Sequence, residues 1–354
     1  MNAYIGVDLH ENYSFFTAKN RDGKIMAPLR KIINREREIL DYLSHFKNPK
    51  VTLEATLNWY WLVDLLQDYN YDVTLAHPKK AKAIASTKIK SDKISSKILA
   101  DLLRSDLIPA CYIPDREKRT LRDFLRHRTV LVSIRTSLKN RIHAVLRNFN
   151  FHCPYSDLFG KSGRTWLKQV SLQSYYKTII DNFLSLIDAI EPKIHEVTKI
   201  IKELAENNPQ ARLVDEIPGI DYYSALLIVL EIGDIRRFSD RRHFCSYIGI
   251  VPSSHSSGDI DYTGKITKEG NSWLRWIIIE AAQKSQTFVN NPYHSLFLKI
   301  SNKKGSAIAK VAVARKIATA IYYMLSKNEH FKLPKSLRSQ ISGVSPVLAI
   351  AQRG

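Results

Sequence analysis

The sequence predicts a chain of three folded parts. They are an α/β domain over residues 1–112, a helical coiled-coil region over 113–208 and a mainly α-helical C-terminal domain over 209–335, followed by a tail over 336–354. Three observations predict this order. Short apolar strands alternate with amphipathic helices in the first part. Two long helical patterns fill the second part, and helical patterns flank a serine- and glycine-rich stretch in the third.

The charge of the chain bounds its partners. The 354 residues carry 54 lysines and arginines against 34 aspartates and glutamates, a formal net charge of +20. That excess favours a polyanion, because neutralising phosphates releases counterions. A membrane surface would attract it too, but no apolar run approaches the roughly 20 residues that span a bilayer.

The termini and cysteines bear on the compartment. The N-terminal residues lack the basic and apolar pattern of a signal peptide. Cys111, Cys153 and Cys245 are far apart and show neither disulfide-framework nor zinc-site spacing. We therefore expect a cytoplasmic protein with incidental or buried thiols.

Two predicted strands of the first domain end in an acid. Strand 4–8 ends at Asp8 and strand 51–54 ends at Glu54, while Asp92 stands just before an amphipathic helix that ends near residue 104. The other expected elements are strands 13–19 and 71–76 and helices 35–46, 59–68 and 79–90.

These three acids are candidate metal ligands. Acids at the ends of adjacent strands and at a helix start can converge, and carboxylates suit Mg²⁺ (or Mn²⁺). Such a site activates a hydroxyl and stabilises a phosphoryl transition state. Taken singly, each acid is more simply a solvated strand end or helix cap; together, Asp8, Glu54 and Asp92 favour the metal site.

The second part is strongly basic. A long helix from about residue 116 carries charge of nearly one sign, which predicts contact with nucleic acid rather than only a solvated face. Its candidate contact residues are Arg119, Arg122, Arg126, Arg135, Lys139 and Arg141. A loop is expected over 149–163. The following helix places Ile187, Ile194 and Ile201 at heptad spacing, which is typical of a coiled coil within one chain or between two copies. Pro192 is expected to interrupt or kink it.

The third part opens with a turn between two helical patterns. The sequence LVDEIPGI over 213–220, with Gly219 in the turn, resembles a helix-hairpin-helix. Such motifs present backbone N–H groups to a phosphate without reading bases. A plain turn between helices is the alternative.

A serine-rich stretch follows at 252–270, PSSHSSGDIDYTGKITKEG. Ser256 and Ser257 precede a glycine, and Lys265 and Lys268 come after it. A hydroxyl at a glycine turn, with lysines nearby, suits a nucleophile that attacks a phosphodiester. Taken alone, the stretch is more simply a surface loop. A helix over 271–287 is expected next.

Two sets of motifs resemble one family. YIGVD, LEAT, KSDKISSKILADLL and YIP resemble the RuvC-like DEDD domain of an insertion-sequence transposase family. IPGI, EIGDIRRF, YIGIVP, SSG and GKITKEGN resemble that family's C-terminal transposase domain, and the likeness runs over roughly residues 3–325. The family includes the Piv-type DNA invertases and the bridge-RNA-guided recombinases.

The resemblance implies a RuvC/RNase H-like fold and a cut-and-rejoin recombinase. A serine would attack DNA and form a phosphoserine link, and the acids with Mg²⁺ would assist. A structured guide RNA would pair with double-stranded target and donor DNA, and the protein would act as a dimer or tetramer. The family's nucleophile maps onto Ser257, with Ser256 as the near alternative, and its first three acids map onto Asp8, Glu54 and Asp92.

The fourth acid of the family motif is replaced by Ser95. Asp101 is expected to face the opposite side and to be a poor substitute. A hydroxyl is a weaker metal ligand than a carboxylate. Ser95 or a water completes a weakened site, or activity is reduced, or catalysis tolerates the loss. The alternatives to a recombinase are a metal-dependent nuclease or junction resolvase without a covalent intermediate, and a catalytically inactive nucleic-acid-binding protein.

Overall fold

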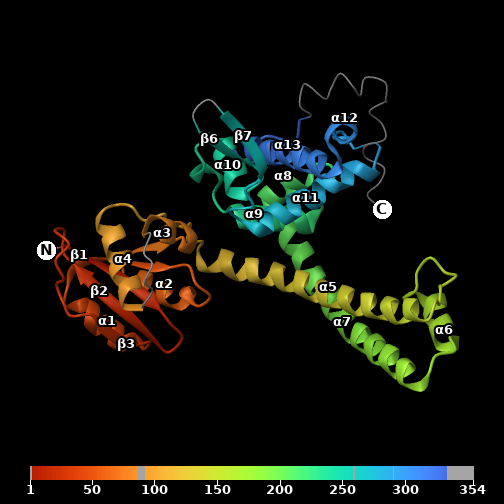
Figure 1. The fold of residues 1–354 in the computed structure, drawn as a ribbon, viewed down its shortest axis with the longest axis horizontal. Coiled ribbons are helices and arrows are strands. Elements are labelled where there is room, and N and C mark those ends of the chain that lie inside the picture. The colour runs from red at the N-terminus through yellow and green to blue at the C-terminus, as the bar shows by residue number, and fades with distance from the viewer. Residues whose placement is uncertain (1, 86–91, 258–259, 290, 333–354) are drawn as a thin grey trace. The chain divides into compact units, whose positions relative to one another are not determined.

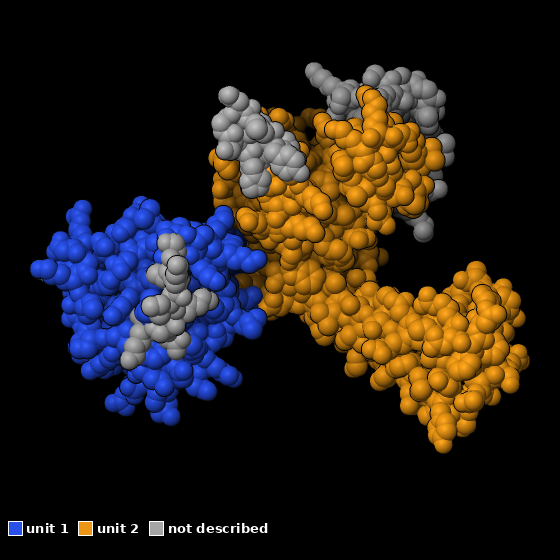
Figure 2. Space-filling view, in the orientation of Figure 1, with its two compact units in different colours: residues 1–116 blue, residues 117–354 orange. Residues whose placement is uncertain are grey.

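The computed structural model describes residues 2–85, 92–257, 260–289 and 291–332. Residues 2, 92–93, 254–257 and 260–263 are described by their backbone alone. The chain divides into two compact units, Met1–Arg116 and Glu117–Gly354, which are coloured separately in Figure 2. We call them the N-terminal unit and the C-terminal unit.

The N-terminal unit is built on a mixed five-stranded sheet (Figure 1). Its strands are β1 (Asn2–Leu9), β2 (Tyr13–Lys19), β3 (Arg30–Ile33), β4 (Lys47–Glu54) and β5 (Asp72–Ala76), in the order β3-β2-β1-β4-β5. The first three strands are antiparallel, while β4 is parallel to β1 and β5 is parallel to β4. The carboxyl ends of β1, β4 and β5 therefore meet at one edge of the sheet.

Helices cover both faces of this sheet. On one face, α1 (Glu36–Ser44) and α2 (Trp59–Asp68) bury Ile39 and Leu62 in one core with Ile5 and Val7 of β1. The other face carries α4 (Asp92–Arg104), and α3 (Pro78–Ala85) follows β5. Alternation along β1 explains the two layers, since successive side chains of a strand point to opposite faces.

In the C-terminal unit, α5 (Arg116–Asn148), α6 (Lys161–Gln169) and α7 (Ser174–Glu206) form a helical hairpin (Figure 1). Ile142 of α5, Leu167 of α6 and Ile187 of α7 share a buried cluster. Helix α6 begins within the segment predicted as a loop. Helix α7 is continuous through Pro192, so the expected interruption does not occur.

The largest core surrounds α9 (Tyr222–Ile232), every residue of which from Tyr223 onward is buried. Around it lie α8 (Pro209–Asp215), a 3₁₀ turn (Ile235–Arg237), α10 (Arg241–Ile248), α11 (Ser272–Thr287), α12 (His294–Lys304) and α13 (Ser306–Lys327). Val197 and Ile201 of α7 belong to this same core. The second and third parts predicted from the sequence thus share one hydrophobic core.

The serine-rich stretch is a β-hairpin rather than a loop. Strands β6 (Pro252–Ser257) and β7 (Ile260–Ile266) pair antiparallel. Small polar residues hid the first strand in the sequence, because they carry little apolar alternation. No helix in the described part of the chain is long and apolar enough to cross a membrane.

Candidate active site

Asp8 and Glu54 end two neighbouring parallel strands. Each stands one residue beyond the paired residues Val7 of β1 and Leu53 of β4. Equivalent positions on adjacent strands lie about 4.8 Å apart and point to the same face. That face carries α4, because Gly6, two residues before Asp8, packs against the α4 backbone. Both carboxylates are only partly exposed. The edge formed by Asp8 and Glu54 is called the carboxylate edge below.

Helix α4 runs antiparallel to β1, which directs its N-terminus toward the carboxylate edge. Ser96, near the start of α4, hydrogen-bonds through its hydroxyl to Thr17, which pairs with Gly6. Asp101, further along α4, accepts a hydrogen bond from Lys19 Nζ at 2.5 Å. Lys19 lies at the opposite end of the β1–β2 ladder, where it pairs with Tyr4.

The same orientation places the remaining predicted acids. The backbone of Asp92 opens α4 on the side of the carboxylate edge, while its side chain lies outside the described residues. Ser95, one turn later, is half-buried. Asp101 is engaged with Lys19 and Arg104 away from that edge, so it does not take the place of the fourth acid.

Sequence reasoning missed His10. Its Nε2 lies 3.8 Å from Asp8 Oδ2, and its ring packs against Tyr13, with centroids 5.0 Å apart. The His10 carbonyl accepts hydrogen bonds from the side-chain amides of Asn34 at 2.7 Å and Asn58 at 3.0 Å. A histidine two residues after a strand-end acid was the available signal, because the strand alternation repeats every two residues.

The donor chemistry of this edge fits a hard cation. Asp8 and Glu54 offer carboxylate oxygens on one face of the sheet, which are the ligands that Mg²⁺ prefers. Among the side chains that the structure describes, no three His, Cys, Asp or Glu groups are arranged to hold a metal ion. Asp92, the third candidate, stands outside that set of side chains.

The candidate nucleophiles lie at the far end of β6. The backbone pairs Ser256 with Asp261 and Ser257 with Ile260. Two exposed lysines, Lys265 on β7 and Lys268 just after it, follow on the same hairpin. The hairpin therefore carries both serines at the end remote from the helical core.

The basic residues of α5 predicted to contact nucleic acid lie in three different environments: buried, ion-paired and exposed. Arg119 and Arg122 are buried, and Arg122 donates from Nε to the Leu230 carbonyl at 2.7 Å. Arg126 forms an ion pair with the buried Glu231, with Nη2 2.6 Å from Oε1. Three of the six predicted contact residues thus use their donors or their burial inside the C-terminal unit.

The remaining three lie further along α5. Arg135 and Lys139 both pair with Glu191 of α7, at 3.2 Å and 3.9 Å. Arg141 is exposed. Of the predicted contact residues on α5, Arg141 is the one whose position best suits a nucleic acid.

Comparison with known families matches both halves of the chain. A family model described as a transposase, of the IS110 DEDD type, matches residues 5–151. A second, described as the transposase IS116/IS110/IS902 family, matches residues 211–298. The first match contains the carboxylate edge. The second contains the β6–β7 hairpin with Ser256 and Ser257, which is called the serine hairpin below. The chain belongs to the IS110-type transposase family.

Relatives of this IS110-type chain carry matching names. It is 27% identical over 228 residues to the transposase for insertion sequence element IS1111A of Coxiella burnetii, which covers 61% of each chain. It is 21% identical to a probable family 20 transposase of Pseudomonas aeruginosa, over 84% of this chain and 90% of that relative. A pilin gene-inverting protein of Moraxella bovis is 29% identical over 46% of this chain and 52% of its own length.

The turn predicted as a helix-hairpin-helix packs inward in this IS110-type chain. Gly219 has φ +100°, and a Cβ there would lie 2.9 Å from the Ala281 carbonyl of α11. At the start of α9, the Asp221 carboxylate accepts a hydrogen bond from the Ser224 N–H at 2.9 Å. That N–H is the kind that a phosphate would use, and a carboxylate already occupies it. The geometry favours the plain turn.

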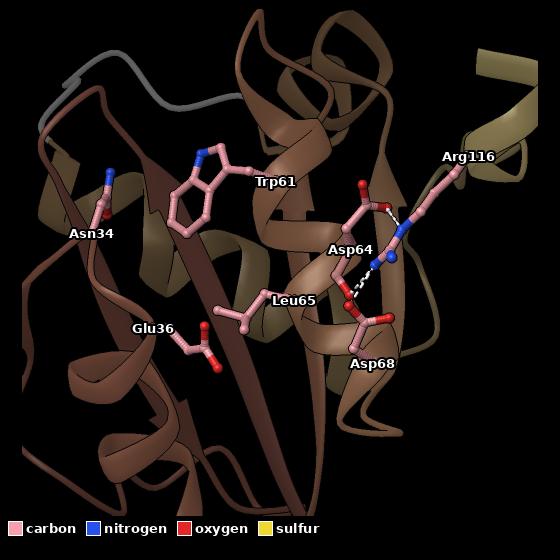
Figure 3. Close-up of a pocket in the computed structure, with 7 residues that line it drawn as sticks. All are labelled: Asn34, Glu36, Trp61, Asp64, Leu65, Asp68 and Arg116. Carbon is pink, nitrogen blue, oxygen red and sulfur yellow. Dashed lines mark hydrogen bonds and ion pairs between the residues drawn. The ribbon is translucent and has the colours of Figure 1, made fainter. Parts of the chain in front are cut away.

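Acids also gather beside α1 and α2, in a hollow of about 460 Å³ that Asn34 and Arg116 also line. Figure 3 shows the Arg116 guanidinium between Asp64 and Asp68 of α2. Arg116 Nη2 lies 2.6 Å from Asp68 Oδ2, and Nε lies 3.2 Å from Asp64 Oδ1. Hydrogen bonds to Asp68 and then Asp64 raise the pKa of Arg116. The Arg116 guanidinium therefore balances the charge of these two acids.

Proposed function

We propose that this chain is a DNA transposase that cuts and rejoins DNA through a covalent phosphoserine intermediate. Ser257 is the proposed nucleophile, with Ser256 as the alternative. The observation that carries this proposal is that one chain contains two elements. One is the carboxylate edge in the N-terminal unit, and the other is the hairpin in the C-terminal unit whose first strand ends in two serines. Each element lies within a match to the same transposase family.

The reaction proposed for the serine needs no external energy source. The Ser257 hydroxyl loses its proton to a base, and its oxygen forms a bond to the scissile phosphorus. The bond from phosphorus to one deoxyribose oxygen breaks, and that oxygen takes up a proton. In rejoining, a deoxyribose oxygen of the new partner strand attacks the phosphoserine and releases the serine. One phosphodiester is exchanged for another, so atoms and electrons balance.

Asp8, Glu54 and Asp92 are the residues proposed to hold Mg²⁺ or Mn²⁺. Such an ion would neutralise charge on the phosphate and lower the pKa of a bound hydroxyl. The chain's own contribution is to hold two carboxylates on one face of a rigid sheet. Ser95 would add a neutral oxygen in place of the family's fourth acid. The strand order and directions of the sheet support the RuvC/RNase H-like assignment.

The proposed partners are double-stranded target and donor DNA and a structured guide RNA encoded with the element. The net charge of +20 supports polyanionic partners. Guidance by RNA and assembly as a dimer or tetramer follow from the resemblance of the motifs to bridge-RNA-guided recombinases. Arg141, Lys265 and Lys268 are exposed cations that suit phosphate contacts.

An adduct assay tests the proposal. The protein is incubated with the candidate RNA, Mg²⁺ and labelled DNA, then denatured, and the DNA that stays bound to protein is measured. We expect an adduct that Ser257→Ala abolishes and Ser256→Ala retains, with DNA binding unchanged in both. Wild-type protein that cleaves DNA without any adduct would contradict the serine mechanism.

The carboxylate edge also supports a second candidate, a metal-dependent nuclease or junction resolvase that uses the acids alone. It would cleave DNA with no adduct and would tolerate Ser257→Ala. Ser95 motivates a third, an inactive nucleic-acid-binding protein, which would bind with steep salt dependence and leave DNA intact with any metal.

A further inference from the structure

A buried carboxylate contacts Asn271, a few residues after the serine hairpin. Glu231 of α9 is 0% exposed, and its side chain accepts from two different elements. Arg126 of α5 donates to Oε1 from Nε at 2.9 Å and from Nη2 at 2.6 Å. Asn271, the residue that caps α11, donates its side-chain amide to Oε2 at 2.8 Å. Both carboxylate oxygens of Glu231 are therefore used.

Asn271 stands where the chain leaves the hairpin. Strand β7 ends at Ile266, and Asn271 follows five residues later. Its side-chain oxygen accepts from the Leu274 N–H at 3.0 Å and so caps α11, while its backbone N–H donates to the Tyr247 carbonyl at 2.8 Å. One residue thus ties the end of the hairpin segment to α9, α10 and α11.

At the base of the hairpin, the backbone just before β6 and the backbone just after β7 are in very close contact. A Cβ on Gly249 would lie 2.2 Å from the Glu269 carbonyl, and a Cβ on Gly270 would lie 2.1 Å from the Tyr247 carbonyl. Both glycines have positive φ, of 76° and 111°. The Lys268 N–H also donates to the Gly249 carbonyl at 3.2 Å. The backbone segments before β6 and after β7 are therefore tightly packed against each other, and Asn271 is the last residue of the segment after β7 before α11 begins.

We propose that Glu231, fixed by Arg126, is a positioning residue that sets the direction of the serine hairpin through Asn271. This inference rests on the proposed function of Ser257. A six-residue strand spans roughly 20 Å, so a tilt of about 10° at its base displaces its far end by roughly 3 Å. A misplacement of about 1 Å in a reacting group costs on the order of 100-fold in rate. Small changes at Glu231 are thus amplified at Ser257.

Two variants test the network. Asn271→Ser keeps a side-chain oxygen to cap α11 but is too short to donate to Glu231. Glu231→Gln keeps the shape and removes the charge that holds Arg126. The matched control is Asn208→Ser, because Asn208 caps α8 in the same way, accepting from the Ala211 N–H at 2.9 Å, and has no contact with Glu231 in the hydrogen bonds described.

The first readout is the initial rate of adduct formation per folded protein, beside DNA affinity and the thermal unfolding midpoint. We expect Asn271→Ser and Glu231→Gln to slow adduct formation at least 10-fold and to leave DNA affinity within about twofold. Asn208→Ser should stay within twofold of wild type in both. Equal adduct rates for Asn271→Ser and Asn208→Ser would overturn the inference.

The second readout does not depend on catalysis. Spin labels at Lys265→Cys on β7 and Lys316→Cys on α13, both exposed positions, report the hairpin direction as a distance distribution. The native cysteines are replaced by alanine. We expect Asn271→Ser and Glu231→Gln to broaden or shift this distribution, and Asn208→Ser to leave it unchanged. An unchanged distribution refutes the positioning role even if adducts form. A broadened one with no wild-type adduct keeps the positioning role and removes the proposed function.

Discussion

Gly6 of β1 and Ser96 of α4 approach so closely that no side chain fits between them. A Cβ on Gly6 would lie 2.1 Å from the Ser96 carbonyl oxygen and 2.5 Å from the Ala100 nitrogen. The contact fixes where α4 crosses the sheet. Because α4 runs antiparallel to β1, it also directs the start of the helix, at Asp92, toward Asp8 and Glu54.

Gly6→Ala is expected to destabilise the N-terminal unit strongly. The added methyl group would meet backbone atoms that cannot rotate away, and overpacking of this kind costs about 1–3 kcal/mol or more. Ser96→Ala, which removes the hydrogen bond with Thr17 and adds no atoms, should cost about 1 kcal/mol. Urea unfolding of both variants measures the difference. A Gly6→Ala protein as stable as wild type would show that α4 is not seated as described.

Metal affinity should depend on the carboxylate edge and not on the acids beside Arg116. We expect Asp8→Asn and Glu54→Gln each to weaken Mn²⁺ binding at least 10-fold, because each removes a charged oxygen ligand. Asp64→Asn is the matched control, since Asp64 pairs with Arg116. Calorimetric titration with Mn²⁺ gives the affinities. A loss in Asp64→Asn equal to that in Asp8→Asn would place the metal elsewhere.

Ser95→Asp is expected to raise Mn²⁺ affinity. It restores a carboxylate at the family's fourth-acid position, one turn after the start of α4. Ser95 is half-buried, so a carboxylate there lowers the stability of the fold when no cation is bound. A bound cation would offset that cost, and the added carboxylate would strengthen metal binding. The same titration should show tighter binding, and unfolding without metal should show lower stability. Unchanged affinity would mean that this position does not face the metal.

The same substitution at two arginines of α5 should affect two different properties, nucleic-acid binding in one case and stability in the other. Arg141→Gln removes an exposed cation, and we expect weaker nucleic-acid binding with a salt slope reduced by about 1. Arg122→Gln removes a buried donor to α9, and we expect lost stability of about 1–3 kcal/mol. Binding across a salt series, beside thermal unfolding, separates the two. Equal effects of both variants on the salt slope would contradict this assignment.

Much of the fold could be predicted from apolar spacing. Strand β2 and helix α2 have the same bounds that the sequence predicts, 13–19 and 59–68. The placement of Asp8 and Glu54 at neighbouring strand ends was predicted as well. The hairpin β6–β7 was predicted as a loop, because serines and glycines carry no strand signal until a partner strand pairs with them.

The sequence by itself determined the local elements, the net charge and the two motif sets, because these depend on residue types at short spacing. Only the tertiary structure decided which charged side chains form ion pairs and hydrogen bonds inside the fold. Arg126 and Glu231 are 105 residues apart, and Arg122 and Leu230 are 108 apart, so no local pattern marks them as partners. A basic helix looks alike in sequence whether its arginines face phosphates or a neighbouring helix. Their burial follows from packing between distant segments, and that packing distinguishes the exposed Arg141 from the buried Arg122.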